Sequence, residues 1–524
     1  MKMNTLITLS IIICFFINSI PVLSANIQKD FIAEEQNTNI LESSLFHQSE
    51  KLDHIPFSSQ QKPDFLDMPH STTNAGPEYI ILVVDIHKIR ILDESIEDPE
   101  YYIDIIVDGE EPEWKNTDIM TEKEVWLQWP AIYHSLPYNE NSPITIDIEL
   151  YLKNKLWFDK QLDISAGPEK TLSLTYDPKR GDWSGGDYLG DSSGYGHASG
   201  FEDGDFNDKD FEIWFDIYQL EVADNHYLDG DTLTYWEETN IYNSNPFTDD
   251  GLQDSDEDGI PSEWEDKYGY NPFSWDDHLT LDPDHDGLQN NEEYETNEWL
   301  SHPFVQDIFI EVDFMEGKYF WSKPYTFTEG SAYLLTNAFA KKGISMHVDL
   351  GIYGGGGDYA PYQERTVGME LQAARLKYFL QGTPDHWRRG IFHWAFICSR
   401  IEYFDREVGG RMFYVDSFVL ARQTIIDNTF TYIYLKFSNP TIGMASVFMH
   451  ELGHTLGLMD FSGIDNTDTT KPWKLGFWQY RAYESCMNYH YTYKLIDYSN
   501  GDDDSEFDQD DWGTLDLTRF EQEW

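Results

Sequence analysis

The chain has 524 residues and a formal net charge of −60 at pH 7, from 95 acidic and 35 basic side chains. This charge excludes a general affinity for nucleic acids or anionic lipids, because both would repel the protein, and it favours cations as partners. The length exceeds what one hydrophobic core usually holds, so we expect two to four domains.

Residues 1–25 have the pattern of a secretory signal peptide. Lys2 precedes an apolar run over residues 6–17, and small residues follow at Ser24 and Ala25. An uncleaved membrane anchor is the alternative, but the run is short for a bilayer span. No later segment is long and apolar enough to cross a membrane. We therefore expect a secreted or extracellular-surface protein, with no transmembrane span after signal cleavage.

The next two stretches differ in their hydrophobic pattern. Residues 26–76 are polar without a sustained period, which favours a linker or pro-segment. Residues 77–220 contain short alternating or β-branched runs separated by turns, which predict a β-sandwich domain. In residues 144–150, isoleucines alternate with polar side chains, so one face would meet a core and the other water. The predicted strands cover residues 79–86, 101–107, 124–129, 144–151, 156–164, 171–176 and 211–217.

Two acidic loops lie within residues 221–304 and fit the twelve-residue pattern that wraps calcium. Each has aspartate at positions one, three and five, glycine at six and glutamate at twelve, while the seventh residue contributes its carbonyl oxygen. Acidic loops that are merely solvated are the alternative, but the glycine and glutamate of both copies argue against it. The predicted calcium ligands are Asp254, Asp256, Asp258, Ile260 and Glu265 in the first loop and Asp282, Asp284, Asp286, Leu288 and Glu293 in the second.

These loops belong to an internal repeat. A degenerate third copy precedes them at residues 229–238, and triplets of the form X-Pro-Phe begin at Asn245, Asn271 and His302. The array resembles thrombospondin type 3 repeats. The segment has few large apolar residues, so calcium would be structural there, neutralising and ordering a semi-rigid spacer.

The last stretch, residues 305–524, is predicted to be an α/β (α+β) domain. Strands are expected at residues 307–314 and 344–350, with a helix at 329–342 between them. Two more strands, at 391–399 and 412–420, would precede a buried apolar helix. The whole chain is thus expected to be multidomain, with a β-sandwich, a calcium-loop spacer and this C-terminal domain.

A metal-binding motif lies in that apolar helix. His450 and His454 would stand one turn apart on one face, so that two imidazoles can bind one zinc ion with Glu451 beside them. Gly457 would end the helix and let the chain turn, bringing Asp460 to the metal as third ligand. Three protein ligands leave a position open for water, as a catalytic zinc site requires. The alternative is a chance motif on a surface helix, but unpaired histidines would be costly in a buried one.

A second motif follows at Ser485-Cys-Met-Asn-Tyr489. The pattern H-E-x-x-H-x-x-G-x-x-D followed by S-x-M-x-Y resembles the metzincin clan of zinc peptidases. The resemblance implies that Met487 forms the Met-turn beneath the metal and that Tyr489 reaches the zinc or the oxyanion of the reaction. Asp460 stands where most metzincins have histidine, as in the snapalysin-like enzymes. Another possibility places the third ligand at Glu484.

We therefore expect a secreted zinc endopeptidase, a hydrolase of protein or peptide substrates with catalytic zinc and structural calcium. Glu451 would be the general base and Tyr489 would help to hold the oxyanion. The alternative function is a calcium-dependent extracellular adhesion or binding protein with a vestigial zinc site.

Three cysteines occur in the chain, and Cys14 would leave with the signal peptide. The remaining two, Cys398 and Cys486, lie outside the reducing cytosol in a secreted protein and are expected to form a disulfide. The alternative is two buried free thiols, since sequence does not give the distance between their Cα atoms.

Overall fold

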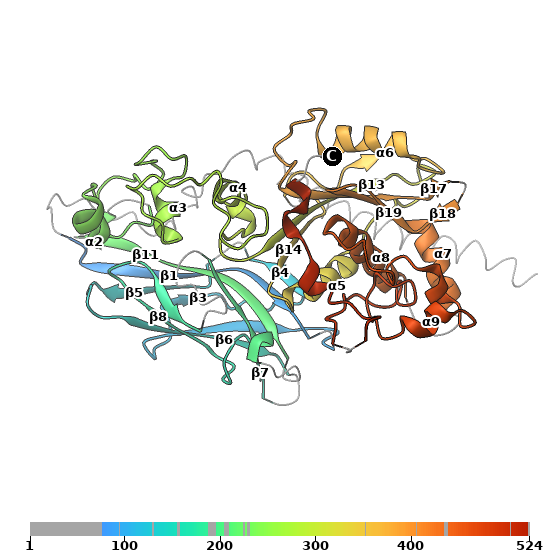
Figure 1. Ribbon diagram of the computed structural model, residues 1–524. Coiled ribbons are helices and arrows are strands. Elements are labelled where there is room, and N and C mark those ends of the chain that lie inside the picture. The colour runs from blue at the N-terminus through green and yellow to red at the C-terminus, as the bar shows by residue number, and fades with distance from the viewer. Residues whose placement is uncertain are drawn as a thin grey trace, which may run out of the picture. The chain divides into compact units, whose positions relative to one another are not determined.

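The computed structural model combines several sheets with helices, so the chain has a mixed α and β architecture (Figure 1). All described residues belong to a compact unit formed by residues 63–524. The predicted signal peptide and nearly all of the predicted linker or pro-segment lie outside them. No helix in the described part is both long and apolar enough to span a bilayer. The described residues are 76–93, 95–127, 130–154, 158–186, 195–203, 209–223, 226–227, 231–351, 353–404, 406–433, 439–502 and 505–521.

The first sheet is antiparallel and is built around two long strands, β1 (Tyr79–Ile91) and β11 (Phe211–Ala223), which pair along most of their length with one register shift between Ile86 and Lys88. Its other strands are β10 (Gly196–Ser199) beside β11, β5 (Ile132–Pro137) beside β1, β3 (Trp114–Lys115) beside β5, β4 (Glu124–Trp126) beside β1, and β12 (His226–Tyr227) beside β11.

A second antiparallel sheet shares one hydrophobic core with the first, the arrangement of a sandwich. In β6, Ile144, Ile146 and Ile148 are buried, while Thr145 points to solvent, as the alternation predicts. The sequence did not predict β5, because His134, Ser135 and Pro137 interrupt its apolar pattern. The sheet contains β2 (Tyr101–Val107), β6 (Ile144–Leu152), β8 (Leu172–Tyr176) and β9 (Trp183–Gly185) in spatial order, with β7 (Lys160–Leu162) beside β6.

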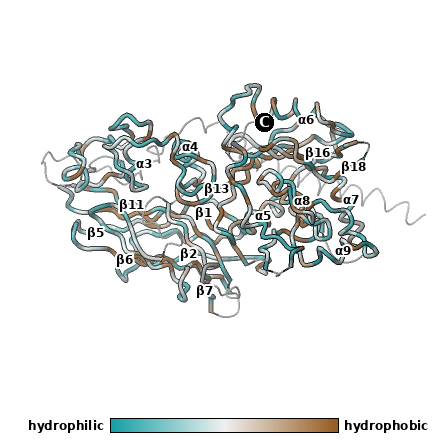
Figure 2. Tube along the Cα trace, viewed as in Figure 1, coloured by the Kyte–Doolittle hydropathy of each residue, from teal (hydrophilic) through white to brown (hydrophobic). Residues whose placement is uncertain are grey.

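The acidic segment between the sandwich and the next sheet has a small apolar cluster of its own, formed by Ile260, Trp264 and Tyr268. Figure 2 shows this segment mostly in hydrophilic colours, in contrast to the strands of the sheets. Its helices are short, so packing contributes little to their stability. They are α2 (Tyr235–Glu237), α3 (Ser262–Lys267) and α4 (Asn290–Thr296).

The C-terminal part is built on a mostly parallel sheet. Its strands are, in spatial order, β14 (Ser345–Asp349), β13 (Asp307–Met315), β16 (Phe392–Cys398), β20 (Ser417–Ala421) and β19 (Gly410–Tyr414), with β15 (Tyr359–Ala360) beside β13; β17 (Ile401–Tyr403) and β18 (Arg406–Val408) form a separate hairpin.

The strand predicted at residues 412–420 is wrong, because the chain turns at Val415 and Asp416 and forms two strands. Buried Asp416 accepts hydrogen bonds from Ser417 and Arg375, which stabilise the turn. As a result β19 runs antiparallel to β20, and it is the terminal strand of the sheet on that side within the described residues.

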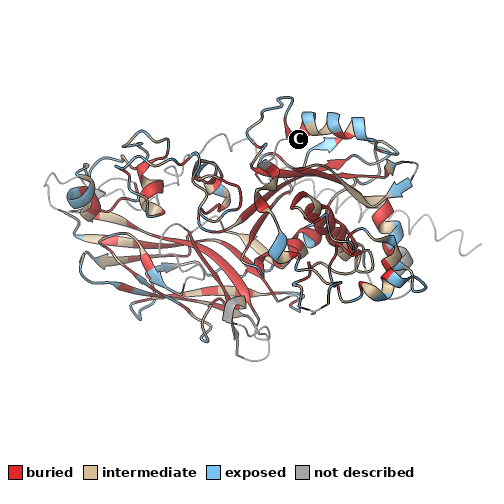
Figure 3. Cartoon of the chain, viewed as in Figure 1, coloured by how far each residue is buried: buried red, intermediate tan, exposed pale blue. Residues whose placement is uncertain are grey.

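Helices cover both faces of this sheet (Figure 1). α6 (Gly368–Ala374) lies on one face, whereas α5 (Glu329–Ala340) and α8 (Pro440–Thr455) lie on the other. Figure 3 shows α8 buried along most of its length. The chain also forms α7 (Arg422–Ile433) and α9 (Leu475–Gln479).

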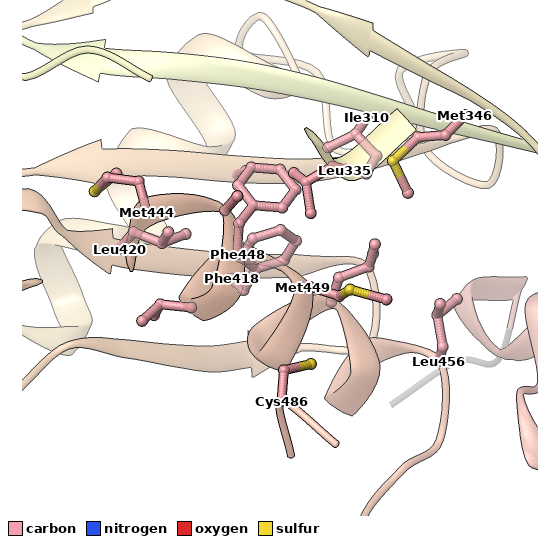
Figure 4. Close-up of a cluster of buried hydrophobic side chains, with 14 of the residues drawn as sticks. Ile310, Leu335, Met346, Phe418, Leu420, Met444, Phe448, Met449, Leu456 and Cys486 are labelled. Carbon is pink, nitrogen blue, oxygen red and sulfur yellow. The ribbon is translucent and has the colours of Figure 1, made fainter. Parts of the chain in front are cut away.

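The predicted disulfide is wrong, because Cys398 and Cys486 are both free and buried. Strand parity explains the separation of their sulfurs. Cys398 follows Trp394 and Phe396 on the sheet face that α6 covers. Cys486 packs on the opposite face, in the cluster that contains Met449 of α8 (Figure 4). The sheet therefore lies between the two thiols.

Candidate metal centre

Helix α8 begins and ends with residues that favour those positions. Asn439 is the N-cap, and its side chain accepts a hydrogen bond from the Ile442 amide at 2.8 Å. Pro440 occupies the first turn, where its missing N–H costs nothing. Near the other end, Gly457 has φ of +96°, a conformation that favours glycine. The buried helix between them carries His450 and His454 one turn apart, with Glu451 directly after His450.

Backbone carbonyls orient both imidazoles. Nδ1 of His450 lies 2.9 Å from the carbonyl oxygen of Cys486, and Nδ1 of His454 lies 2.8 Å from that of Leu458. A carbonyl oxygen only accepts, so each Nδ1 carries a proton and donates it. Nε2 is therefore the nitrogen that each ring can give to a metal, and this is the outer-shell arrangement typical of metal-binding histidines.

Asp465, and not the predicted Asp460, completes this group. Its carboxylate oxygens lie 3.0 Å from Nε2 of His450 and 3.4 Å from Nε2 of His454. Ligand atoms of a tetrahedral ion with bonds of about 2.0 Å are about 3.3 Å apart, so these spacings fit zinc. Asp460 is exposed and outside the group, and so is Glu484.

The path of the chain after Gly457 explains this correction. Leu458 is buried and holds His454 through its carbonyl, which leaves Met459 and Asp460 facing outward. The chain then returns, and the amide of Asp465 donates to the carbonyl of Met487 at 3.3 Å. This contact between two loops places the Asp465 carboxylate at the histidines. Sequence spacing carries no signal for such a contact.

The charges at this centre favour a cation. Burial lowers the pKa of His450, but the hydrogen bond that its ring donates to Asp465 and the charges of Glu451 and Asp465 outweigh this effect and raise that pKa to about 9. Burial opposes ionisation of Asp465, but its hydrogen bonds to His450 and His454 hold its pKa well below the usual range. The carboxylate is thus ionised, and a metal would displace the proton from Nε2 of His450.

Glu451 lies beside the two histidines and against the terminal strand β19. It is 6% exposed, and burial raises its pKa, whereas the charges of His450 and His454 lower it. The backbone amide of Met412 hydrogen-bonds its carboxylate. A Cβ atom on Gly410 would lie 2.5 Å from its Oε1, so the carboxylate contacts the strand directly.

The loop at residues 485–489 lies against the same turn of α8. The Met487 side chain is fully buried. It contacts Gly453 of α8 so closely that a Cβ atom on this glycine would lie 2.7 Å from Sδ of Met487. The Tyr489 ring stacks on the His450 ring with centroids 5.7 Å apart. Burial raises the pKa of Tyr489, and the charge and hydrogen bond of Asp465 raise it further, so the hydroxyl stays protonated.

The two acidic loops form further groups of possible metal ligands. In the first, Asp254, Asp256 and Asp258 lie together, and in the second Asp282, Asp284 and Asp286 do so, with ligand atoms within 4.8 Å of one another. The amides of Ile260 and Leu288 donate to Asp258 and Asp286, so these two residues are held by their backbone in the loops. Part of residues 229–238, including Asp229, lies outside the described residues.

Each loop also has a buried group that includes a residue from outside it. Glu265 joins Asp258 and His278, and Glu293 joins Asp286 and Asp307. Several buried carboxylate oxygens have no hydrogen-bond partner among the described residues, which fits sites for an oxygen-binding cation. These oxygens are Asp256 Oδ2, Glu265 Oε1 and Oε2, Asp284 Oδ2 and Glu293 Oε1.

Comparison with known proteins adds no relative that could assign the centre. No family model matches the chain, and no curated protein matches its sequence.

Proposed function

We propose that the protein is a secreted zinc endopeptidase. The observation that carries the proposal is the convergence of two Nε2 atoms and the Asp465 carboxylate, with both Nδ1 atoms held by carbonyls. A histidine pair that served only packing would not need both rings fixed with their second nitrogens facing one carboxylate. The resemblance to metzincins supports the same function, with Asp465 in the place expected for Asp460.

His450, His454 and Asp465 would hold the zinc ion, with two nitrogen ligands and one oxygen ligand. When bound, zinc would polarise the scissile carbonyl and lower the pKa of a water molecule. Asp465 is 48% exposed at its side chain, so the centre is open to solvent on that side. Substrate and water can therefore approach there.

Glu451 would be the group that moves the proton. It follows His450 directly in the chain, yet it is not among the three ligand candidates. A buried carboxylate with a raised pKa accepts a proton more readily than an exposed one. Glu451 would take the proton of the attacking water and deliver it to the leaving amine.

The substrate would bind along β19. Glu451 contacts this terminal strand at Gly410, and an extended peptide can add to such an edge through main-chain hydrogen bonds. The scissile bond would then lie beside the base. Tyr489, protonated and stacked on His450, would donate a hydrogen bond to the developing oxyanion.

The test is hydrolysis of a peptide library from a proteome digest by the zinc-loaded, calcium-saturated protein, with products mapped by mass spectrometry. Glu451→Gln is the matched variant, because it keeps the shape of the side chain and removes the base. We expect a rate loss of about 100-fold or more, with one zinc still bound per chain. Equal rates in both proteins would refute the mechanism. A zinc-loaded wild type that cleaves nothing would favour the adhesion protein.

A further inference from the structure

Asp307 belongs both to the C-terminal sheet and to the group of carboxylates at the second acidic loop. It is the first residue of β13, which pairs with β14 and β16 at the centre of the C-terminal sheet. It is also 3% exposed and lies against the second acidic loop, where its carboxylate is within 4.8 Å of ligand atoms of Asp286 and Glu293. The amide of Asp307 donates to Oδ2 of Asp286 at 2.6 Å.

The same backbone contact recurs in each unit of the repeat. An aspartate stands five positions after the start of every X-Pro-Phe triplet. Its amide donates to an aspartate of the preceding acidic stretch, at 3.0 Å for Asp250 to Asp231 and at 3.2 Å for Asp276 to Asp258. Asp307 makes this contact in the last unit. The repeat thus continues into the first strand of the sheet, across the predicted boundary between residues 304 and 305.

The buried group at Asp307 contains one carboxylate oxygen without a hydrogen-bond partner among the described residues. Glu293 is 1% exposed, and its Oε1 has no hydrogen-bond partner among the described residues, while Oε2 accepts from Ser301. Asp286 is fully buried. Carboxylates buried in this way require protons or a cation.

We propose that Asp307 is a ligand of the calcium ion in the second loop, so that this ion joins the repeat to β13 of the C-terminal sheet. The proposal rests on the proposed calcium loops and adds a ligand from outside the twelve-residue pattern. Calcium suits the site because every side chain of the group supplies oxygen and the ion accepts six to eight such ligands.

The first loop differs at the corresponding place. There His278 faces Asp258 at 3.2 Å and Glu265 at 3.8 Å, while the side chain of Asp276 is not in the group. Calcium prefers oxygen to imidazole nitrogen, and its affinity rises with the number of charged ligands. The second loop should therefore bind calcium more tightly than the first.

The contacts of Asp307 would pass the effect of the ion to a second strand. Oδ1 of Asp307 lies 2.6 Å from Nε2 of His347 on β14, and Asp307 pairs in register with Ser345. The His347 ring in turn stacks on Phe309 of β13 with centroids 4.3 Å apart. Calcium in the second loop would thus fix the starts of two adjacent strands.

The first test is a calcium titration of the full zinc-loaded chain. Asp307→Asn keeps the shape and the backbone amide but removes the charge, and Asp276→Asn is the matched control at the equivalent position. We expect Asp307→Asn to weaken the tighter site by about tenfold or more and Asp276→Asn to change it by less than about twofold. Unchanged affinities in Asp307→Asn would overturn the proposal. Wild type that binds no calcium would instead refute the calcium loops.

The second test is decided by the wild-type protein, and the two variants are added to it. Hydrogen exchange of the wild type is compared with and without calcium, with zinc present throughout. We expect calcium to slow exchange in residues 305–315 and 344–350 as well as in the loops. Protection confined to residues 254–293 would overturn the coupling. Asp307→Asn should lose the calcium-dependent protection of 305–315, and Asp276→Asn should retain it.

Discussion

At the residue scale, the candidate zinc centre depends on one carboxylate from a loop. Asp465 contacts both imidazoles and Tyr489, although its side chain is 48% exposed. What fixes it is its own backbone, which donates to the carbonyl of Met487. Met487, which packs against α8, therefore also positions the third candidate ligand through its backbone carbonyl. The position of Asp465 thus depends on both loops.

The ligand set predicts different effects for two aspartates. Asp465→Ala should lower zinc affinity by about 100-fold or more and abolish hydrolysis, because it removes one of three ligands. Asp460→Ala should keep zinc and activity, since that side chain faces solvent. Zinc competition with a chromogenic chelator measures both. If Asp460→Ala lost zinc and Asp465→Ala kept it, the ligand set drawn from the structure would be wrong.

The sequence predicted the two histidines and Glu451 because their spacing on one helix is local. It missed Asp465 because the distance in sequence after a glycine turn does not fix where the chain returns. The carbonyl groups of Leu458 and Cys486, which accept hydrogen bonds from the two Nδ1 atoms, could not be predicted either, because every residue has a backbone carbonyl. The predicted cysteine bridge is wrong because the alternation of side chains along β16 puts Cys398 on the sheet face opposite to Cys486.

At the element scale, the hairpin of β19 and β20 provides the strand along which we propose that the substrate binds. The sequence predicted one strand at residues 412–420 in place of these two, because the apolar run continues through Val415 and Asp416 is the main sign of a turn. The separation matters because it turns β19 into an antiparallel terminal strand beside Glu451. Without the hairpin, β20 would be the terminal strand, and it runs parallel to β16.

The close approach of Gly410 to Glu451 gives a prediction about this strand. Alanine there would place Cβ 2.5 Å from Oε1, too close for contact, so the carboxylate must move. We expect Gly410→Ala to lower kcat by about 100-fold while zinc content stays at one per chain. Gly368→Ala is the control, because no atom lies within 4 Å of its added Cβ. A wild-type kcat in Gly410→Ala would show that Glu451 does not need this position.

Two strands of the sandwich predict a pH-dependent stability. Asp85 of β1 lies directly opposite Asp216 of β11. Burial, and then the charge of Asp216, raise the pKa of Asp85 to about 7. Its folded-state pKa is above the unfolded value, so its contribution to stability is present below about pH 4 and lost as pH rises through about 7.

Asp85→Asn should therefore raise Tm at pH 8 by about 2 to 6 °C and leave it unchanged near pH 4, with calcium held constant. Asp216→Asn is the control, because it removes the ion pair of Asp216 with Lys267 at 2.8 Å and should not gain stability. Thermal unfolding followed by circular dichroism measures both. An equal Tm gain for Asp85→Asn at both pH values would contradict the titration.

At the scale of the whole molecule, apolar burial is unevenly distributed. The sandwich and the two faces of the C-terminal sheet have large cores, whereas the cluster that the described part of the acidic segment forms by itself, around Trp264, is small. Composition predicted this contrast, since the segment is rich in aspartate and poor in large apolar residues. It could not predict that Asp307 belongs to both the segment and the sheet, because the boundary lies inside one repeat unit.

Removal of calcium should therefore open the acidic segment before the rest of the molecule. Without the ions, the carboxylates at residues 254–293 repel one another and little packing opposes local unfolding. We expect limited proteolysis of calcium-free, zinc-loaded protein to cut residues 254–293 about tenfold faster or more than in calcium, leaving fragments from 79–223 and 307–521 intact. Mass spectrometry locates the cuts, and metal analysis verifies that zinc is retained. Cuts that appear first at residues 79–223, or at unchanged rates in the acidic segment, would show that calcium does not hold this part of the chain together.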